Sequence, residues 1–85
     1  MSGLTPQKIE ELLRERLPGT TFCKCVDFSD GCGTKFEVEV ESTSFEGLAL
    51  LARHRAVNAA LKEEMHLIHA LSIKRAAPPP AVSAE

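Results

Sequence analysis

The chain has 85 residues and a net charge of −2 at pH 7, with 44% hydrophobic and 26% charged residues. This length allows one small domain with a modest core. The slight negative charge argues against a general nucleic-acid binder, which normally carries a basic patch, and no apolar run approaches the roughly 20 residues of a helical membrane span.

Residues 6–16 are predicted to form a helix. Thr5 can cap its N-terminus, and Pro6 fits the first turn because the N–H that proline lacks is not needed there. The helix should end before Pro18, since a residue that precedes proline avoids the α region. The apolar positions recur with helical spacing on one side: Ile9, Leu12, Leu13 and Leu17.

Two strands joined by a turn are predicted next. The stretch TTFCKCVDF, residues 20–28, is rich in β-branched and aromatic residues, and Phe22, Val26 and Phe28 share one parity. The stretch TKFEVEVES alternates apolar and charged residues, as expected for a strand with one solvent-facing side. We expect an antiparallel hairpin in which the turn SDGCG carries Cys32 at its tip.

A second helix and a third strand are predicted in the second half of the chain. The strand is LIHALSIK, residues 67–74, in which His69 shares its parity with Leu71 and Ile73. The helix, residues 49–64, precedes it, and its apolar stripe comprises Leu50, His54, Val57, Leu61 and Met65.

The order of these elements predicts a two-layer α+β domain with the arrangement αββαβ. Two helices that cover one face of a three-stranded sheet make the economical packing. The outer face of the sheet is then expected to carry Lys35, Glu37 and Glu39. The domain should span residues 1–76, followed by a disordered Pro/Ala-rich tail, 77–85, that cannot build a core.

Cysteine and histidine side chains are the first candidates for chemistry. Cys32 lies in a glycine-flanked turn, where we expect an exposed and mobile thiol, and His69 is a candidate metal ligand because neutral imidazole is a common one. Each also has a structural explanation, namely an incidental surface thiol and a histidine hydrogen-bonded to the backbone. Cys23 and Cys25 should point to one face about 6.6 Å apart, which suits a disulfide poorly and favours a reducing compartment.

Other candidate sites are weaker. His66 and His69 form an H-x-x-H pattern, but the helix is predicted to end between them, so we do not expect a complete zinc site. Arg53, His54 and Arg55 are consecutive on a helix and therefore do not form one basic face; Arg53 and Arg55 should meet solvent or a partner. We find no nucleophile elbow, P-loop or Rossmann fingerprint, and so small a chain has little room for a substrate pocket, which makes an enzyme the weakest class.

The N-terminal stretch MSGLTPQKIEELLRERL is amphipathic and contains three glutamates. It lacks the apolar centre of a secretory signal and the acid-poor character of a transit peptide. We therefore expect a cytoplasmic location, with the nucleus as a second compartment.

The second half of the chain resembles the BolA family. Three elements carry the resemblance in order: Phe45-Glu46-Gly47, then Arg53-His54-Arg55 with Val57, Asn58 and Leu61, then Ile68-His69-Ala70-Leu71. The upstream stretch GCGTKFEVEVES fits the family's hairpin, whereas the first helix and the tail match by pattern alone. Many relatives carry lysine where this chain has Leu48, which removes a basic residue from a region proposed to contact nucleic acid or a partner.

The resemblance implies an αββαβ fold similar to the class II KH arrangement. BolA-like proteins bind monothiol glutaredoxins and share a bridged [2Fe–2S] cluster with them, and this complex acts in iron–sulfur trafficking and iron regulation. The family's histidine falls on His69 and its hairpin-loop ligand falls on Cys32, as in the loop-cysteine branch, whose eukaryotic members are mostly cytosolic or nuclear. No family role falls on His66.

The chemistry of the cluster agrees with shared ligation. A [2Fe–2S] cluster needs four ligands, and Cys32 and His69 supply at most two of them, so a glutaredoxin cysteine and glutathione would supply the others. Two alternatives stay open. One is a nucleic-acid-binding transcriptional regulator that uses the KH-like fold, although the chain has no G-x-x-G loop. The other is an adaptor that binds glutaredoxin around Arg53 and Arg55 without holding a cluster.

Overall fold

The first helix begins and ends at the predicted residues. The computed structural model describes residues 4–29 and 34–80, and α1 spans Pro6–Arg16. The Thr5 side-chain oxygen accepts the backbone N–H of Lys8 at 3.1 Å, which caps the helix. At the other end, the N–H of Leu17 donates to the carbonyl of Leu13 at 2.8 Å, in extended backbone that leads into Pro18. Local sequence signals therefore account for where this helix begins and ends.

The predicted hairpin consists of β1 (Thr20–Asp27) and β2 (Lys35–Ser42), which pair antiparallel. The alternation in β2 is confirmed, because Phe36, Val38 and Val40 are fully buried. Cys32 and the rest of residues 30–33 in the turn lie outside the described residues.

The inward face of β1 differs from what its aromatic parity suggests. Cys23 pairs with Val40 and is buried, as is Cys25 two residues later. Phe22, Val26 and Phe28 have the opposite parity and are 40–49% exposed on the outer face. The register with β2 decides this assignment, since residues paired directly across two strands share a face.

The second helix is shorter than predicted. The α-helix α2 spans Leu50–Ala60, and a 3-10 helix, η2 (Lys62–Leu67), follows it. The helix stops at Leu61, whose φ of −106° and ψ of 17° leave the α region. Of the predicted apolar stripe, Val57 and Leu61 are fully buried and Met65 packs against the core, but Leu50 is 58% exposed. The prediction was wrong for Leu50 because α2 is buried through its second half, away from its first turn.

The third strand, β3 (Ala70–Ala77), begins and ends three residues later than predicted. His69 therefore lies directly before the strand and not within it. The sheet order is β1-β2-β3, and β3 runs parallel to β2. A parallel neighbour requires a crossover connection, which η1 (Thr43–Phe45), α2 and η2 provide.

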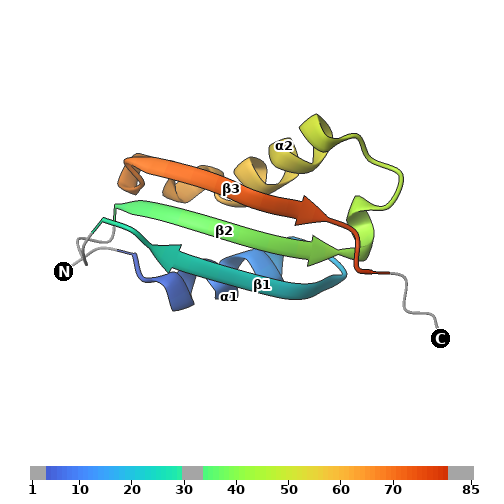
Figure 1. Cartoon of the computed structure of the whole chain (residues 1–85). Helices are drawn as coiled ribbons and strands as arrows, with labels where there is room; N and C mark the ends of the chain where they lie inside the picture. Colours follow the sequence, from blue (N-terminus) through green and yellow to red (C-terminus); the bar gives the residue numbers. More distant parts are fainter. Residues whose placement is uncertain (1–3, 30–33, 81–85) are drawn as a thin grey trace.

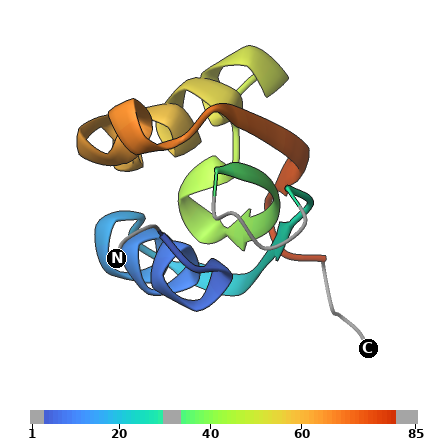
Figure 2. The ribbon, with the colours of Figure 1, turned by 90° about the vertical axis from the view of Figure 1, so that its left-hand side faces the viewer.

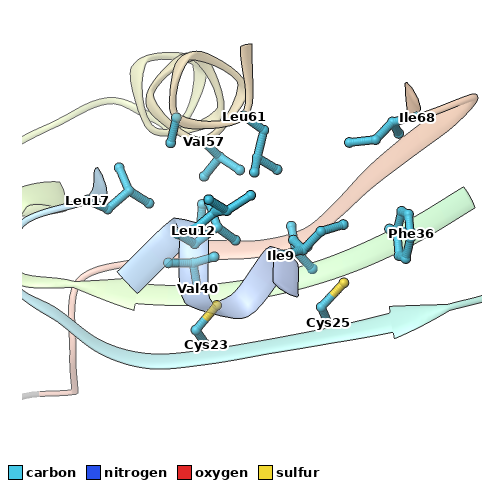
Figure 3. Packing of buried hydrophobic residues seen from close by; sticks show 14 of the residues in the cluster. Ile9, Leu12, Leu17, Cys23, Cys25, Phe36, Val40, Val57, Leu61 and Ile68 are labelled. Carbon is cyan, nitrogen blue, oxygen red and sulfur yellow. The ribbon is translucent and has the colours of Figure 1, made fainter. Parts of the chain in front are cut away.

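Both helices lie on one side of the three-stranded sheet, as the end view shows (Figure 1, Figure 2). The buried side chains of α1, α2 and the inner sheet face meet between these layers (Figure 3). On the open face, Glu39 pairs with Lys74 at 3.8 Å and Glu41 pairs with Arg75 at 3.1 Å. The two-layer αββαβ architecture is thus confirmed. Within the described ranges, neither 11-residue α-helix is long and apolar enough to cross a bilayer.

Two glycines with positive φ give a matched test of this packing. Gly19 (φ 73°) and Gly47 (φ 80°) both occupy the left-handed region, but a Cβ on Gly19 would overlap the Thr43 hydroxyl oxygen, whereas a Cβ on Gly47 would meet open space. We expect Gly47→Ala to cost about 1–2 kcal/mol of unfolding free energy, the usual penalty for this backbone region. Gly19→Ala should cost more, measured by urea denaturation of both variants.

The added cost of Gly19→Ala should shrink in a Thr43→Ala background, because the overlapping oxygen is then gone. Equal costs at the two glycines, unaffected by Thr43→Ala, would show that the contact between residues 19 and 43 is unimportant.

Candidate functional site

His69 lies at the base of the loop between β1 and β2. Its backbone N–H donates to the carbonyl oxygen of Thr34 at 2.6 Å, and the N–H of Ala70 donates to the same oxygen at 3.2 Å. Thr34 is the residue that precedes β2, so these two bonds begin the pairing of β3 with β2. The His69 residue is exposed. Its main chain is therefore held while the residue faces solvent.

The loop base is closed by a second set of contacts, which we call the loop neck: Asp27, Phe28, Ser29, Thr34 and Lys35. The N–H of Phe28 donates to the Lys35 carbonyl at 2.9 Å. The N–H of Ser29 donates to Asp27 Oδ1 at 2.8 Å, and the Ser29 hydroxyl donates to the same oxygen. Ser29 Oγ in turn accepts the N–H of Thr34 at 3.3 Å. Sequence reasoning missed this neck, because Asp, Ser and Thr are ordinary turn residues and only the contacts reveal their role.

The segment that leads to His69 is anchored to α1 by an arginine. The Arg16 guanidinium donates to the Ala60 carbonyl at 2.8 Å and to both carboxylate oxygens of Glu64, at 2.7 and 3.2 Å. These hydrogen bonds hold the pKa of Glu64 below its ordinary value. Because Ala60 ends α2 and Glu64 lies in η2, one side chain fixes the turn between the two helices. That turn sets where the chain enters β3.

The remaining predicted site residues lie elsewhere. Cys32 is outside the described residues, so the structure does not show whether it approaches His69. His66 lies on η2 and is exposed. Among residues 4–29 and 34–80, no three His, Cys, Asp or Glu side chains are grouped so as to hold a metal ion.

Cys23 and Cys25 are free thiols beneath α1, with their sulfur atoms toward the apolar layer (Figure 3). The prediction that they share one face is confirmed. Burial raises the pKa of Cys23 to about 11, and burial with the nearby Glu10 carboxylate raises that of Cys25 to about 12. Only the thiolate form of cysteine binds metals and reacts as a nucleophile. Because these two thiols stay protonated at neutral pH, we assign them to the hydrophobic core and not to a metal-binding or reactive site.

Arg53 and Arg55 differ in their surroundings, which confirms that the Arg-His-Arg stretch is not one basic face. Arg53 Nε donates to the Leu48 carbonyl at 2.9 Å and its Nη1 donates to the Ala76 carbonyl at 3.2 Å. Arg55 is exposed, and no hydrogen bond or ion pair within the described part of the chain engages it. Arg53 contacts the far end of β3, which lies about 20 Å from Ala70 at the usual rise per residue. Arg53 and His69 therefore lie at opposite ends of β3.

Comparison with known proteins gives one consistent result. The family model described as BolA-like protein matches residues 8–79. Protein BOLA2 of Arabidopsis thaliana is 53% identical over 76 residues, which cover 89% of this chain and 81% of that protein. BolA-like protein 2 of Homo sapiens is 43% identical over 72 residues, with coverages of 80% and 84%. The crystal structure of a bol-like protein from Babesia bovis is similar with a TM-score of 0.77 and 42% identity, and the match covers 91% of this chain and 88% of that one.

The buried thiols predict a loss of stability at alkaline pH. In the unfolded chain both thiols ionise at their ordinary pKa near 9, whereas the folded pKa values are about 11 and 12. The contribution of each neutral thiol to the free energy of unfolding is thus fully present below about pH 8.5 and is lost as the pH rises toward the pKa of that thiol in the folded protein. At pH 10 the loss should be on the order of 1 kcal/mol per thiol, measured by urea denaturation between pH 7 and 10.

The matched control is the Cys23→Ala/Cys25→Ala double variant, which keeps Cys32 and all lysines. Its stability should start lower, because two core side chains are truncated, but should fall less steeply with pH. The same slope in both proteins would contradict the assignment to these thiols.

Proposed function

Because the chain belongs to the BolA family, we propose that it is a non-enzymatic protein of iron–sulfur trafficking and iron regulation. In this proposal it binds a monothiol glutaredoxin and shares a bridged [2Fe–2S] cluster with it, as the family resemblance implies. The cluster is cargo held between two proteins, with glutathione as an additional ligand.

One observation carries the proposal: His69 is exposed while its backbone is hydrogen-bonded to the end of the loop that contains Cys32. Cys32 precedes Thr34 by two residues, so covalent geometry limits their Cα atoms to about 7 Å apart. The His69 N–H contacts Thr34 itself. The chain connectivity therefore keeps Cys32 within two residues of the point where the His69 backbone is held, which supports the proposal, and a soft sulfur and nitrogen pair suits an iron–sulfur cluster.

These two residues fit half of a cluster's ligand set. We propose that His69 contributes a ring nitrogen and Cys32 a thiolate, while a glutaredoxin cysteine and glutathione complete the four ligands. Imidazole ligation raises the reduction potential of a cluster relative to ligation by four thiolates. A protonated imidazole cannot coordinate iron, so protonation detaches the histidine from the cluster. Such a cluster suits transfer or sensing better than electron storage.

A second contact region is proposed at the other end of the domain, around Arg53 and Arg55. Arg53 is used on backbone carbonyls, so Arg55 is the arginine that can reach a partner. Leu51, four residues earlier on α2, is on the same side of the helix as Arg55 and is exposed, and Leu48 and Leu50 are exposed as well. Exposed apolar side chains next to an arginine are typical of protein contact surfaces. We propose that glutaredoxin contacts this region when no cluster is present.

The nucleic-acid alternative gains no support from the described surface. The guanidinium of Arg53 is directed at the chain itself, and the outer face of β2 carries Glu37, Glu39 and Glu41. Glu39 and Glu41 pair with Lys74 and Arg75, so these two cations are already matched by carboxylates and do not form a free basic patch for a phosphate backbone. We propose a cytoplasmic location, with the nucleus as a second compartment, in keeping with the resemblance to the loop-cysteine branch.

Reconstitution with a monothiol glutaredoxin, glutathione, iron and sulfide tests shared ligation. We expect a visible circular dichroism spectrum that differs from that of the glutaredoxin homodimer and that is altered or lost in His69→Ala and Cys32→Ala. His66→Ala is the matched control, because it removes another exposed histidine three residues away. If the wild type and all variants gave only the glutaredoxin spectrum, cluster sharing would be excluded and the adaptor hypothesis favoured.

Binding of cluster-free glutaredoxin tests the second region. Arg55→Glu should weaken the complex several-fold by calorimetry while changing the unfolding free energy by less than about 0.5 kcal/mol, as expected at an exposed position. Arg53→Ala should instead lower stability by about 1 kcal/mol or more, because it removes two hydrogen bonds from a charged donor. Unchanged affinity in Arg55→Glu would refute this contact.

A further inference from the structure

We propose that Ser29 is a positioning residue that holds the end of the β1–β2 loop against His69. The proposal rests on the function proposed above, because His69 is one of the ligands suggested there. It assigns a role to a side chain that would not itself contact the cluster.

The Ser29 hydroxyl makes two different hydrogen bonds at once. It donates to Asp27 Oδ1 and accepts the backbone N–H of Thr34 at 3.3 Å. The Ser29 backbone N–H also donates to the same carboxylate oxygen, at 2.8 Å. A hydroxyl is one of the few groups that can donate and accept in this way, so alanine cannot replace it. Ser29 therefore ties Asp27, the last residue of β1, to Thr34, the residue that precedes β2.

Thr34 is held through both of its backbone polar groups. Its N–H donates to Ser29 Oγ, and its carbonyl accepts the N–H groups of His69 and Ala70. A continuous path of hydrogen bonds thus runs from Asp27 through Ser29 and Thr34 to the backbone of His69. Loss of the Ser29 hydroxyl would release the Thr34 N–H and leave this path without its first half.

The position of Ser29 separates this role from simple stabilisation of the fold. Ser29 lies beyond the last paired residues of the hairpin, Asp27 and Phe36, and is only partly buried. The bond from the Phe28 N–H to the Lys35 carbonyl closes the hairpin without it. We therefore expect Ser29→Ala to fold. Metal ligands need placement within about 0.5 Å, so a small shift at the neck is enough to disturb a site that includes His69.

The test compares Ser29→Ala with Ser29→Thr, which keeps the hydroxyl, and with a matched control. Thr21→Val is that control, because the Thr21 hydroxyl donates to the Glu41 carbonyl at 3.3 Å near the opposite end of the same hairpin. In the cluster-free protein, amide hydrogen exchange at Thr34 should accelerate about tenfold or more in Ser29→Ala only. In the reconstituted complex with glutaredoxin, Ser29→Ala should change the visible circular dichroism spectrum and shorten cluster retention several-fold, and Ser29→Thr should restore both.

The two proposals fail in different ways. If the wild type forms a mixed cluster but Ser29→Ala matches Thr21→Val in spectrum and retention, the positioning role is overturned and shared ligation stands. If the wild type forms no mixed cluster, shared ligation fails, and the ligand-positioning role fails with it. Unchanged exchange at Thr34 in Ser29→Ala would overturn the clamp itself, whatever the cluster does.

Discussion

The parallel pairing of β3 with β2 is the constraint on which the rest of the structure depends. It begins where the Thr34 carbonyl accepts the N–H groups of His69 and Ala70. Parallel strands start at the same end of a sheet, so the residue before β3 must lie beside the residue before β2. The same pairing requires α2 to cross over the sheet, which places it on the side of α1 and closes the core (Figure 2). One topological choice thus builds the core and brings His69 to the loop.

Features encoded by neighbouring residues were predictable, and those decided by distant partners were not. The Thr5 cap and Pro6 specify α1, and the alternation of Phe36 with its charged neighbours specifies β2. The inward face of β1 depends on the register with Val40, and the end of α2 depends on Arg16, which is 44 residues away from Ala60. In each of these cases tertiary contacts override the local pattern.

The candidate site shows the same division between local and distant information. His69 and Cys32 came from a motif resemblance, and chemistry alone left each with a structural explanation. What the structure adds is the placement of His69 against Thr34 and the contacts of Ser29 and Asp27. Serine, threonine and aspartate are so common in turns that their sequence pattern carries no sign of a shared role.

The two ends of the domain favour control through the choice of interface and not through a change of fold. Under the function proposed above, the His69 end would offer a fixed backbone and two of a cluster's four ligands, whereas Arg55 and the exposed leucines lie on and just before α2. The length of β3, about 20–25 Å, separates them, and Arg16 and Arg53 tie the intervening α2 and η2 to the frame at both ends. A partner that docks at one end leaves the other accessible. If the protein shares a cluster with glutaredoxin as proposed, loading of the cluster would move glutaredoxin from one surface to the other, and the state of iron would be read from which surface is free.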